Sequence, residues 1–204
     1  MTVPTTDSPI ASSAASSATS TATAPMPALP MRVMLRDGRE VVLREICGAD
    51  KAAVLDAFHH LSAESRHSRF MAAMRELPED LLESTTHPLP AREFVLVAAG
   101  SEDGHEALFG GARFVRQAGH ACEFAVTVAD NWHGSGLGRQ LMQVLLEVAR
   151  ARGYRQMMGY VLASNTSMRA LAHRLGFADE ACPQDPTLRI VTCPLAEPAS
   201  GAAS

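Results

Sequence analysis

The feature that most constrains this chain is a glycine-rich stretch directly before a strongly periodic helix. Gly134, Gly136 and Gly138 alternate within Trp132-His133-Gly134-Ser135-Gly136-Leu137-Gly138-Arg139, and apolar residues then recur on one helical face through Val148. Unpaired N–H groups at a helix start attract an anion, and glycine lets the backbone approach its oxygen atoms closely. The stretch therefore predicts a phosphate-binding turn, although these residues alone fit a tight strand-to-helix turn equally well.

Two other nucleotide-binding motifs can be excluded. A Walker loop requires GxxxxGK[ST], and the chain contains no lysine after Lys51. A dinucleotide fingerprint requires GxGxxG and an acidic residue to hold a ribose, but no Asp or Glu occurs between Glu147 and Asp179. The same interval carries arginines that suit a polyanionic cofactor, although most are expected to cap helix ends: Arg150, Arg152, Arg155, Arg169 and Arg174.

The order of apolar patterns predicts a mixed α/β domain. Helical patterns follow Asp50, Glu64 and Pro78, and three closely spaced strands then form an expected antiparallel meander. The strands are expected at residues 94–98, 108–115, 122–128, 157–162 and 187–193, after an initial hairpin around Asp37-Gly38. Helices are expected after the glycines and from Asn165, a capping residue, to Gly176.

Composition and charge limit the classes of function. The 204 residues are 47% apolar with a net charge of −4, which argues against a general nucleic-acid binder. The first 29 residues are rich in Ala, Ser, Thr and Pro and lack the features of a signal peptide. We expect residues 1–29 and 197–204 to be flexible tails around one domain at residues 30–196.

The remaining composition predicts a cytoplasmic protein without a membrane segment or a metal. No apolar run approaches the ~20 residues that a bilayer requires. The four cysteines, Cys47, Cys122, Cys182 and Cys193, lack the spacing of a structural zinc site. Reduced thiols are therefore expected, with a Cys182–Cys193 disulfide as the less favoured alternative.

Two motifs together resemble the GNAT superfamily of N-acetyltransferases. Residues 133–138 match its signature [Q/R]-x-x-G-x-[G/A], except that His133 replaces Gln or Arg. Asn165-x-x-Met168-x-x-Leu171-x-x-x-Leu175-Gly176-Phe177 is typical of its following helix. The resemblance covers residues 33–194 and implies acetyl-CoA as co-substrate. It also implies a mostly antiparallel twisted sheet of about seven strands flanked by about four helices.

A finer likeness concerns the acceptor. Leu35-Arg36-Asp37-Gly38, the segment from Leu61 to Phe70, and Glu123-Phe124-Ala125-Val126 resemble the catalytic domain of bacterial Pat-type protein lysine acetyltransferases. This likeness implies that a protein lysine side chain accepts the acetyl group. Acetylation of a small-molecule amine is an alternative, and so is a non-catalytic acyl-CoA sensor.

The resemblance assigns the cofactor site to three segments. The strand backbone at Val126, Thr127 and Val128 is expected to hold the pantetheine arm and to polarise the thioester carbonyl. The pyrophosphate is assigned to His133, Gly134, Ser135, Gly136, Leu137, Gly138 and Arg139. Asn165 is expected to cap its helix and to bond the cofactor.

Glu123 is the expected general base. It lies between the apolar residues Cys122 and Phe124, where partial burial is expected to raise its pKa, and Pat-like enzymes carry a glutamate at the matching position. The tyrosine that many GNAT enzymes use to protonate the leaving thiolate is replaced by Ala172, followed by His173.

Overall fold

The computed structural model describes residues 25–195 of the chain. Most of the expected 1–29 tail and the whole of the 197–204 tail lie outside this range. In chain order the strands are β1 (Met31–Met34), β2 (Glu40–Glu45), β3 (Glu93–Glu102), β4 (His105–Arg116), β5 (Ala121–Val128), β6 (Gln156–Leu162), β7 (Ala178–Ala181) and β8 (Leu188–Pro194). The helices are α1 (Lys51–His60), α2 (Ala63–Phe70), α3 (Glu79–Thr86), α4 (Leu137–Ala151) and α5 (Thr166–Arg174), with 3₁₀ turns η1 (Gly48–Asp50) and η2 (Asp130–Trp132).

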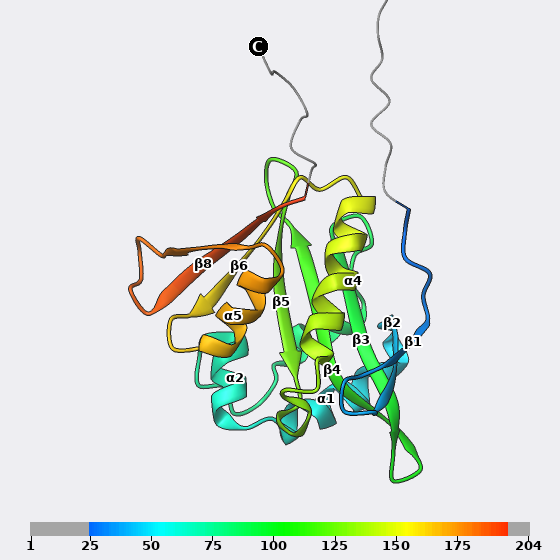
Figure 1. Cartoon of the computed structure of the whole chain (residues 1–204). Coiled ribbons are helices and arrows are strands. Elements are labelled where there is room, and N and C mark those ends of the chain that lie inside the picture. The colour runs from blue at the N-terminus through cyan, green and yellow to red at the C-terminus, as the bar shows by residue number, and fades with distance from the viewer. Residues whose placement is uncertain (1–24, 196–204) are drawn as a thin grey trace, which may run out of the picture.

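A single sheet in the order β1-β2-β3-β4-β5-β6-β8-β7 organises these elements (Figure 1). Neighbouring strands are antiparallel except β5 and β6, which run parallel. This confirms the mixed, mostly antiparallel fold expected from the resemblance. The sheet has eight strands rather than about seven. The additional strand is β7 at the edge of the sheet, which the sequence does not predict because Ala-Asp-Glu-Ala lacks an apolar pattern.

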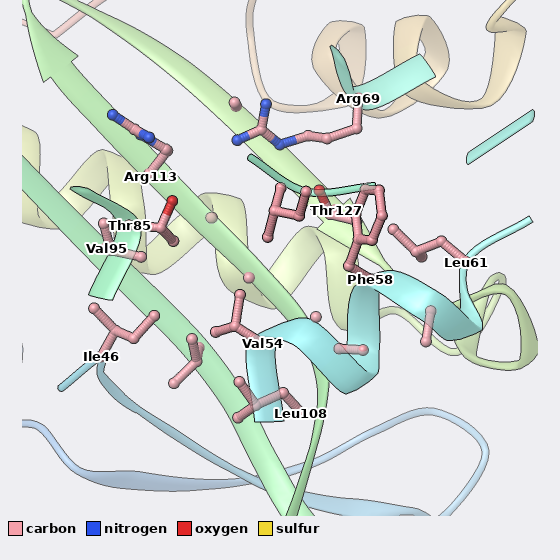
Figure 2. Close-up of a pocket in the computed structure, with 18 of the residues that line it drawn as sticks. Ile46, Val54, Phe58, Leu61, Arg69, Thr85, Val95, Leu108, Arg113 and Thr127 are labelled. Atoms are coloured by element: carbon pink, nitrogen blue, oxygen red, sulfur yellow. The ribbon is translucent and has the colours of Figure 1, made fainter. Parts of the chain in front are cut away.

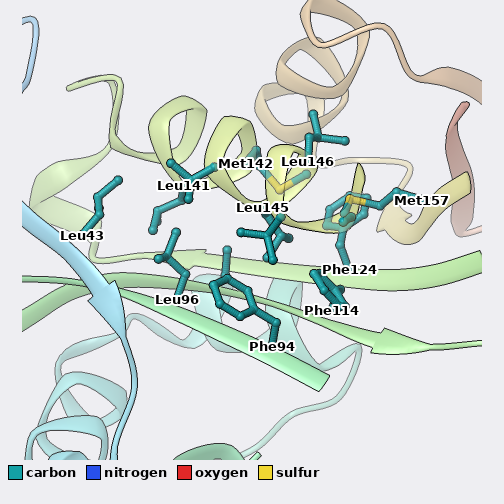
Figure 3. Packing of buried hydrophobic residues seen from close by; sticks show 14 of the residues in the cluster. Leu43, Phe94, Leu96, Phe114, Phe124, Leu141, Met142, Leu145, Leu146 and Met157 are labelled. Carbon is teal, nitrogen blue, oxygen red and sulfur yellow. The ribbon is translucent and has the colours of Figure 1, made fainter. Parts of the chain in front are cut away.

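Helices cover both faces of the sheet. On one face, α4 buries Leu141, Met142 and Leu145 completely against the sheet. Figure 3 shows these side chains above Phe94, Leu96 and Phe114 from the strands. On the other face, α1 packs on β4 and α2 on β5, over a smaller apolar cluster that includes Ile46, Val95 and Leu108.

Local details differ from the sequence expectations at two helix ends. Asp50 precedes α1 as expected, but its carboxylate makes no cap bond to that helix. It accepts hydrogen bonds from both terminal nitrogens of Arg44 and from the Cys47 N–H instead. The second helical pattern, expected over roughly residues 64–74, gives a helix that ends at Phe70, because Met71 adopts a left-handed conformation with φ of 54°.

The parallel pair at the centre of the sheet is short. β5 and β6 are paired only at Ala121–Gln156, Cys122–Met157 and Glu123–Met158, and the strands then diverge. The next positions would be Phe124 and Gly159. A Cβ atom on Gly159 would stand 2.6 Å from the ring of Phe124, so only glycine leaves room for this ring.

We expect Gly159→Ala to destabilise the protein by about 1–3 kcal/mol, because the added methyl group overpacks the Phe124 ring. The measurement is urea-induced unfolding. In a double-mutant cycle, Phe124→Leu should tolerate Gly159→Ala better than the wild type does, with a coupling of about 0.5 kcal/mol or more. Strictly additive effects would contradict this packing account.

Candidate functional site

The divergence of β5 and β6 opens a groove of about 1190 Å³. It is lined by the glycine loop at one end, by α2 and α5 at its sides, and by both diverging strands. Most of the residues assigned from the sequence line it: Glu123, Val126, Thr127, Val128, His133, Gly134, Gly136, Leu137, Gly138, Arg139 and Asn165. Segments far apart in the chain therefore meet in one site.

Ser135 is the exception, because it does not line the groove. Its side chain is 3% exposed. The hydroxyl donates to the Trp132 carbonyl at 2.7 Å and accepts from the Leu137 N–H at 3.2 Å. Ser135 therefore stabilises the bend of the loop and caps the first turn of α4 from inside.

The loop conformation depends on two glycines. Gly134 and Gly136 have φ of +78° and +94°, a region that side chains rarely adopt. Within residues 25–195, the N–H groups of Gly134, Gly136 and Gly138 have no hydrogen-bond acceptor, whereas their neighbours Ser135 and Leu137 do. Alternate N–H groups at the start of α4 are thus free for an anion, and the helix dipole adds to their attraction.

Four arginines add positive charge around the groove, and one of them, Arg69, also lines the cavity described below. Arg36, from the β1–β2 turn, donates its backbone N–H to the Ser135 carbonyl and extends its side chain beside Gly136. Arg139 and Arg174 line the groove from α4 and α5. Arg174 is the only one of the five arginines in the acid-free interval that lines this groove. Arg152, in contrast, bonds the carbonyls of Pro90 and Glu93.

The free edge of β5 presents backbone groups to the groove. The N–H of Ala129 donates to Phe109 on β4, and N–H groups alternate in direction along a strand. Those of Val126 and Val128 therefore point away from β4, toward the groove. The Val128 carbonyl accepts from Nε2 of His133 at 3.0 Å, so this ring nitrogen must carry hydrogen.

Glu123 lines the groove at the last paired position of β5 and β6, where the two strands begin to diverge. The carboxylate is half-buried and accepts a hydrogen bond from the Gln117 amide at 3.1 Å. By strand alternation it shares a face with Ala125 and Thr127, toward α2. The free backbone edge and this carboxylate therefore border the same space.

The structure also shows the positions of Asn165, Ala172 and His173, at the start of α5 and within it. Asn165 accepts from the Met168 N–H at 3.0 Å, which confirms it as the helix cap. Ala172 is buried, His173 is exposed, and neither lines the groove. Tyr160 on β6, which the sequence analysis did not single out, lines the groove and is 40% exposed.

An aspartate connects the glycine loop to α2. Asp130 of η2 accepts hydrogen bonds from the N–H and hydroxyl of Ser62 and from the Ser65 hydroxyl, at 2.7, 3.0 and 2.5 Å. Burial raises the pKa of Asp130, but these hydrogen bonds outweigh it, so the pKa lies below its ordinary value. We call this arrangement the Asp130 clasp. It fixes the start of α2 beside the anion-binding turn.

A second cavity of about 130 Å³ adjoins the groove, between the sheet and helices α1 to α3 (Figure 2). Its walls are mostly apolar, with Val54, Phe58 and Leu108 among them. Arg69 and Arg113 also line it, and Figure 2 shows their guanidinium groups at the same end. Sequence reasoning missed this cavity and Arg36, because both depend on contacts between distant segments that no local pattern signals.

No helix within residues 25–195 is long and apolar enough to cross a bilayer. No group of three or more His, Cys, Asp and Glu side chains in that range could hold a metal ion. All four cysteines are free thiols, so Cys182 and Cys193 do not form a disulfide bond.

Comparison with known proteins agrees with this geometry. Residues 55–177 match the model of the acetyltransferase (GNAT) family. The chain is 35% identical over 154 residues to an acetyltransferase of Pseudomonas aeruginosa, covering 75% of this chain and 83% of that protein. It is 32% identical over 149 residues to the acetyltransferase Pat of Mycolicibacterium smegmatis, covering 72% of this chain and 44% of Pat. The chain thus matches less than half of Pat.

Solved structures show the same fold. The GNAT domain of S. lividans PAT superposes with a TM-score of 0.73 at 23% identity, covering 80% of this chain and 96% of that domain. A putative acetyltransferase of Salmonella typhimurium, solved with its cofactor acetyl-CoA, gives a TM-score of 0.60 at 24% identity, covering 80% and 99%. The groove, the free N–H groups and these comparisons all indicate a coenzyme A site.

We expect Gly134→Ala to weaken coenzyme A binding at least tenfold, which is about 1.4 kcal/mol. Gly153→Ala is the matched control. Both glycines have nearly equal φ, +78° and +77°, and free space for a methyl group, but Gly153 follows α4 at its other end. Both variants should lose similar stability, about 1–2 kcal/mol. Calorimetric titration should show weakened binding only for Gly134→Ala, and equal affinities in the two variants would contradict the assignment.

Proposed function

Because the chain belongs to the acetyltransferase (GNAT) family, we propose that it moves the acetyl group of acetyl-CoA to a primary amine, with Glu123 as general base. Acetyl transfer from acetyl-CoA is the activity of the family, and the amine acceptor and the base are the proposal. The observation that carries it is the position of Glu123, where the free edge of β5 begins.

The base is needed because an amine reacts only in its neutral form. A lysine ammonium has a pKa of about 10.4, so most of it is protonated at neutral pH. In the proposed step the amine nitrogen attacks the thioester carbonyl, Glu123 takes its proton, and the carbon–sulfur bond breaks. Coenzyme A leaves as the thiolate. A positioned base typically contributes about 10²–10⁴-fold to such a rate.

Transfer without an acetyl-enzyme intermediate is supported by the state of the nearest thiol. Cys122 precedes Glu123 and is fully buried. Burial raises the pKa of Cys122 to about 12, so its thiol stays protonated at neutral pH. Because the thiolate is the reactive form of cysteine, Cys122 is a poor nucleophile here.

Backbone groups of β5 would stabilise the charge that develops in the reaction. The N–H groups of Val126 and Val128 point to the groove, and a fixed donor of this kind stabilises a developing oxyanion without reorganising. The leaving thiolate needs less help, because a thiol has a pKa of about 8.5. This is consistent with the buried Ala172 at the usual tyrosine position.

Two acceptor classes fit this reaction. A protein lysine side chain is supported by the resemblance to Pat-type enzymes and by the relation to Pat itself. A small-molecule amine is supported by the cavity that adjoins the groove, since residues of three strands and three helices enclose a volume that suits a compact ligand. An assay of acetyl-CoA consumption with peptides and small amines separates the two.

We expect Glu123→Gln to lower kcat/KM about 10²–10⁴-fold at neutral pH, because the base is lost, while coenzyme A affinity stays within about twofold. The measurement is thiol release from acetyl-CoA in steady state. The rate of the variant should rise with pH, since a more basic solution supplies neutral amine.

Glu180→Gln is the control for this experiment. Glu180 is an exposed strand glutamate on β7 and does not line the groove. Its rate should equal that of the wild type. A Glu123→Gln variant with full activity at neutral pH would remove Glu123 from its proposed role.

A further inference from the structure

Arg69 and Arg113 are the charged groups of a cavity whose other walls are mostly apolar. Arg69 is half-buried near the end of α2 and, within residues 25–195, forms no ion pair or hydrogen bond through its side chain. Arg113 is 16% exposed, and its one carboxylate neighbour in that range, Glu93, is 3.8 Å away. Burial and the charge of Arg113 lower the pKa of Arg69 to about 10.

This arrangement is unfavourable for the empty protein. The Arg69 guanidinium lies 4.8 Å from the centroid of the Phe70 ring, but burying a charge without an anion still costs free energy, and two neighbouring guanidinium groups also repel each other. An anionic ligand would relieve both effects. Carboxylate suits the site because a guanidinium group can donate two parallel hydrogen bonds to it.

The cavity is placed to receive the acceptor. The cavity and the groove share four lining residues and therefore adjoin each other: Arg69, Phe70, Ala125 and Thr127. In the β4–β5 register Arg113 lies opposite Ala125, and Val115 lies opposite Glu123. Arg113 and Glu123 are therefore diagonal neighbours on one face, about 7–8 Å apart with their Cβ atoms somewhat closer. A small molecule can reach both.

We propose that the acceptor carries a carboxylate next to its reacting amine and an apolar side chain, as an apolar α-amino acid does. This inference rests on the proposed acetylation of an amine. The carboxylate binds Arg69 and Arg113, the amine faces Glu123, and the side chain occupies the apolar part of the cavity. The volume of about 130 Å³ is close to the roughly 150 Å³ of an apolar cavity that holds benzene, and an aliphatic side chain such as that of leucine is smaller than benzene.

The same charges disfavour other amines. An ammonium group without a nearby carboxylate would approach two cations, and no carboxylate within residues 25–195 lies closer than 3.8 Å to either of them. A lysine in a peptide chain has its carboxyl group in an amide bond, so it offers no anion to the arginines. The charge pattern therefore favours a free amino acid over a protein lysine.

The test compares amines that differ only in the carboxylate. Acetyl-CoA consumption would be measured with leucine, methionine and phenylalanine, with their amides, and with a lysine-containing peptide. We expect at least one free amino acid to exceed its amide at least tenfold in kcat/KM. In Arg69→Gln and Arg113→Gln this ratio should fall to within about threefold.

Control variants keep the result interpretable. Arg116→Gln removes an exposed arginine from the same strand as Arg113, outside both the cavity and the groove, and should keep the wild-type ratio. Thermal unfolding should show Arg69→Gln as stable as the wild type or more so, because an unpaired charge is removed. Arg69→Lys, which keeps the charge, should retain part of the ratio.

The outcomes separate the inference from the proposed function. If amides or the peptide are acetylated as well as the free amino acids, acetyl transfer stands and the carboxylate site is overturned. If the preference for carboxylate persists in both arginine variants, the assignment to these residues is wrong. If acetyl-CoA is not consumed with any of the amines, the proposed function fails, and the inference fails with it.

Discussion

The separation of β5 from β6 after three paired residues is the constraint on which the site depends. A fully paired strand would have no backbone groups left for a ligand, and an open edge in the middle of a sheet is normally unfavourable. Here the edge faces a groove, and the ring of Phe124 fills the space over Gly159 where the next pair would form. The same divergence leaves the start of α4 open, so the ends of β5 and the glycine turn border one continuous surface.

The two faces of the sheet serve different purposes. On the α4 face, Leu137 and Leu141 are completely buried, which anchors the first turn of the helix and thereby the direction of its free N–H groups. On the α1–α3 face the packing leaves a cavity that contains charged groups. Natural proteins commonly accept a loss of stability where a ligand is to bind, and the dense face compensates for the open one.

Much of this structure follows from local sequence. The alternating glycines predict the turn because only glycine adopts such φ values at low cost, and Asn165 predicts a cap because its carbonyl satisfies a free N–H group. The sequence does not predict β7, whose residues carry no apolar pattern. It also does not predict that the Arg36 side chain lies beside Gly136, because the two residues are far apart in the chain. Nor does it predict the role of Arg69, because the neighbouring sequence does not show that this side chain shares a cavity with residues of β4 and β5. Ser135 was assigned to the cofactor with its loop, but the structure shows its hydroxyl bonded within the turn.

The Asp130 clasp has a consequence for how this chain can change during evolution. The clasp holds Ser62, at the start of α2. Arg69 follows Ser62 by about two helical turns, so Ser62 and Arg69 lie on the same side of the helix. Each residue inserted between them would rotate Arg69 by about 100° relative to the clasp. Substitutions along the outer side of α2 are therefore compatible with the site, whereas insertions and deletions of one or two residues are not. The length of this short helix is therefore expected to vary less among related sequences than the identity of its outer residues.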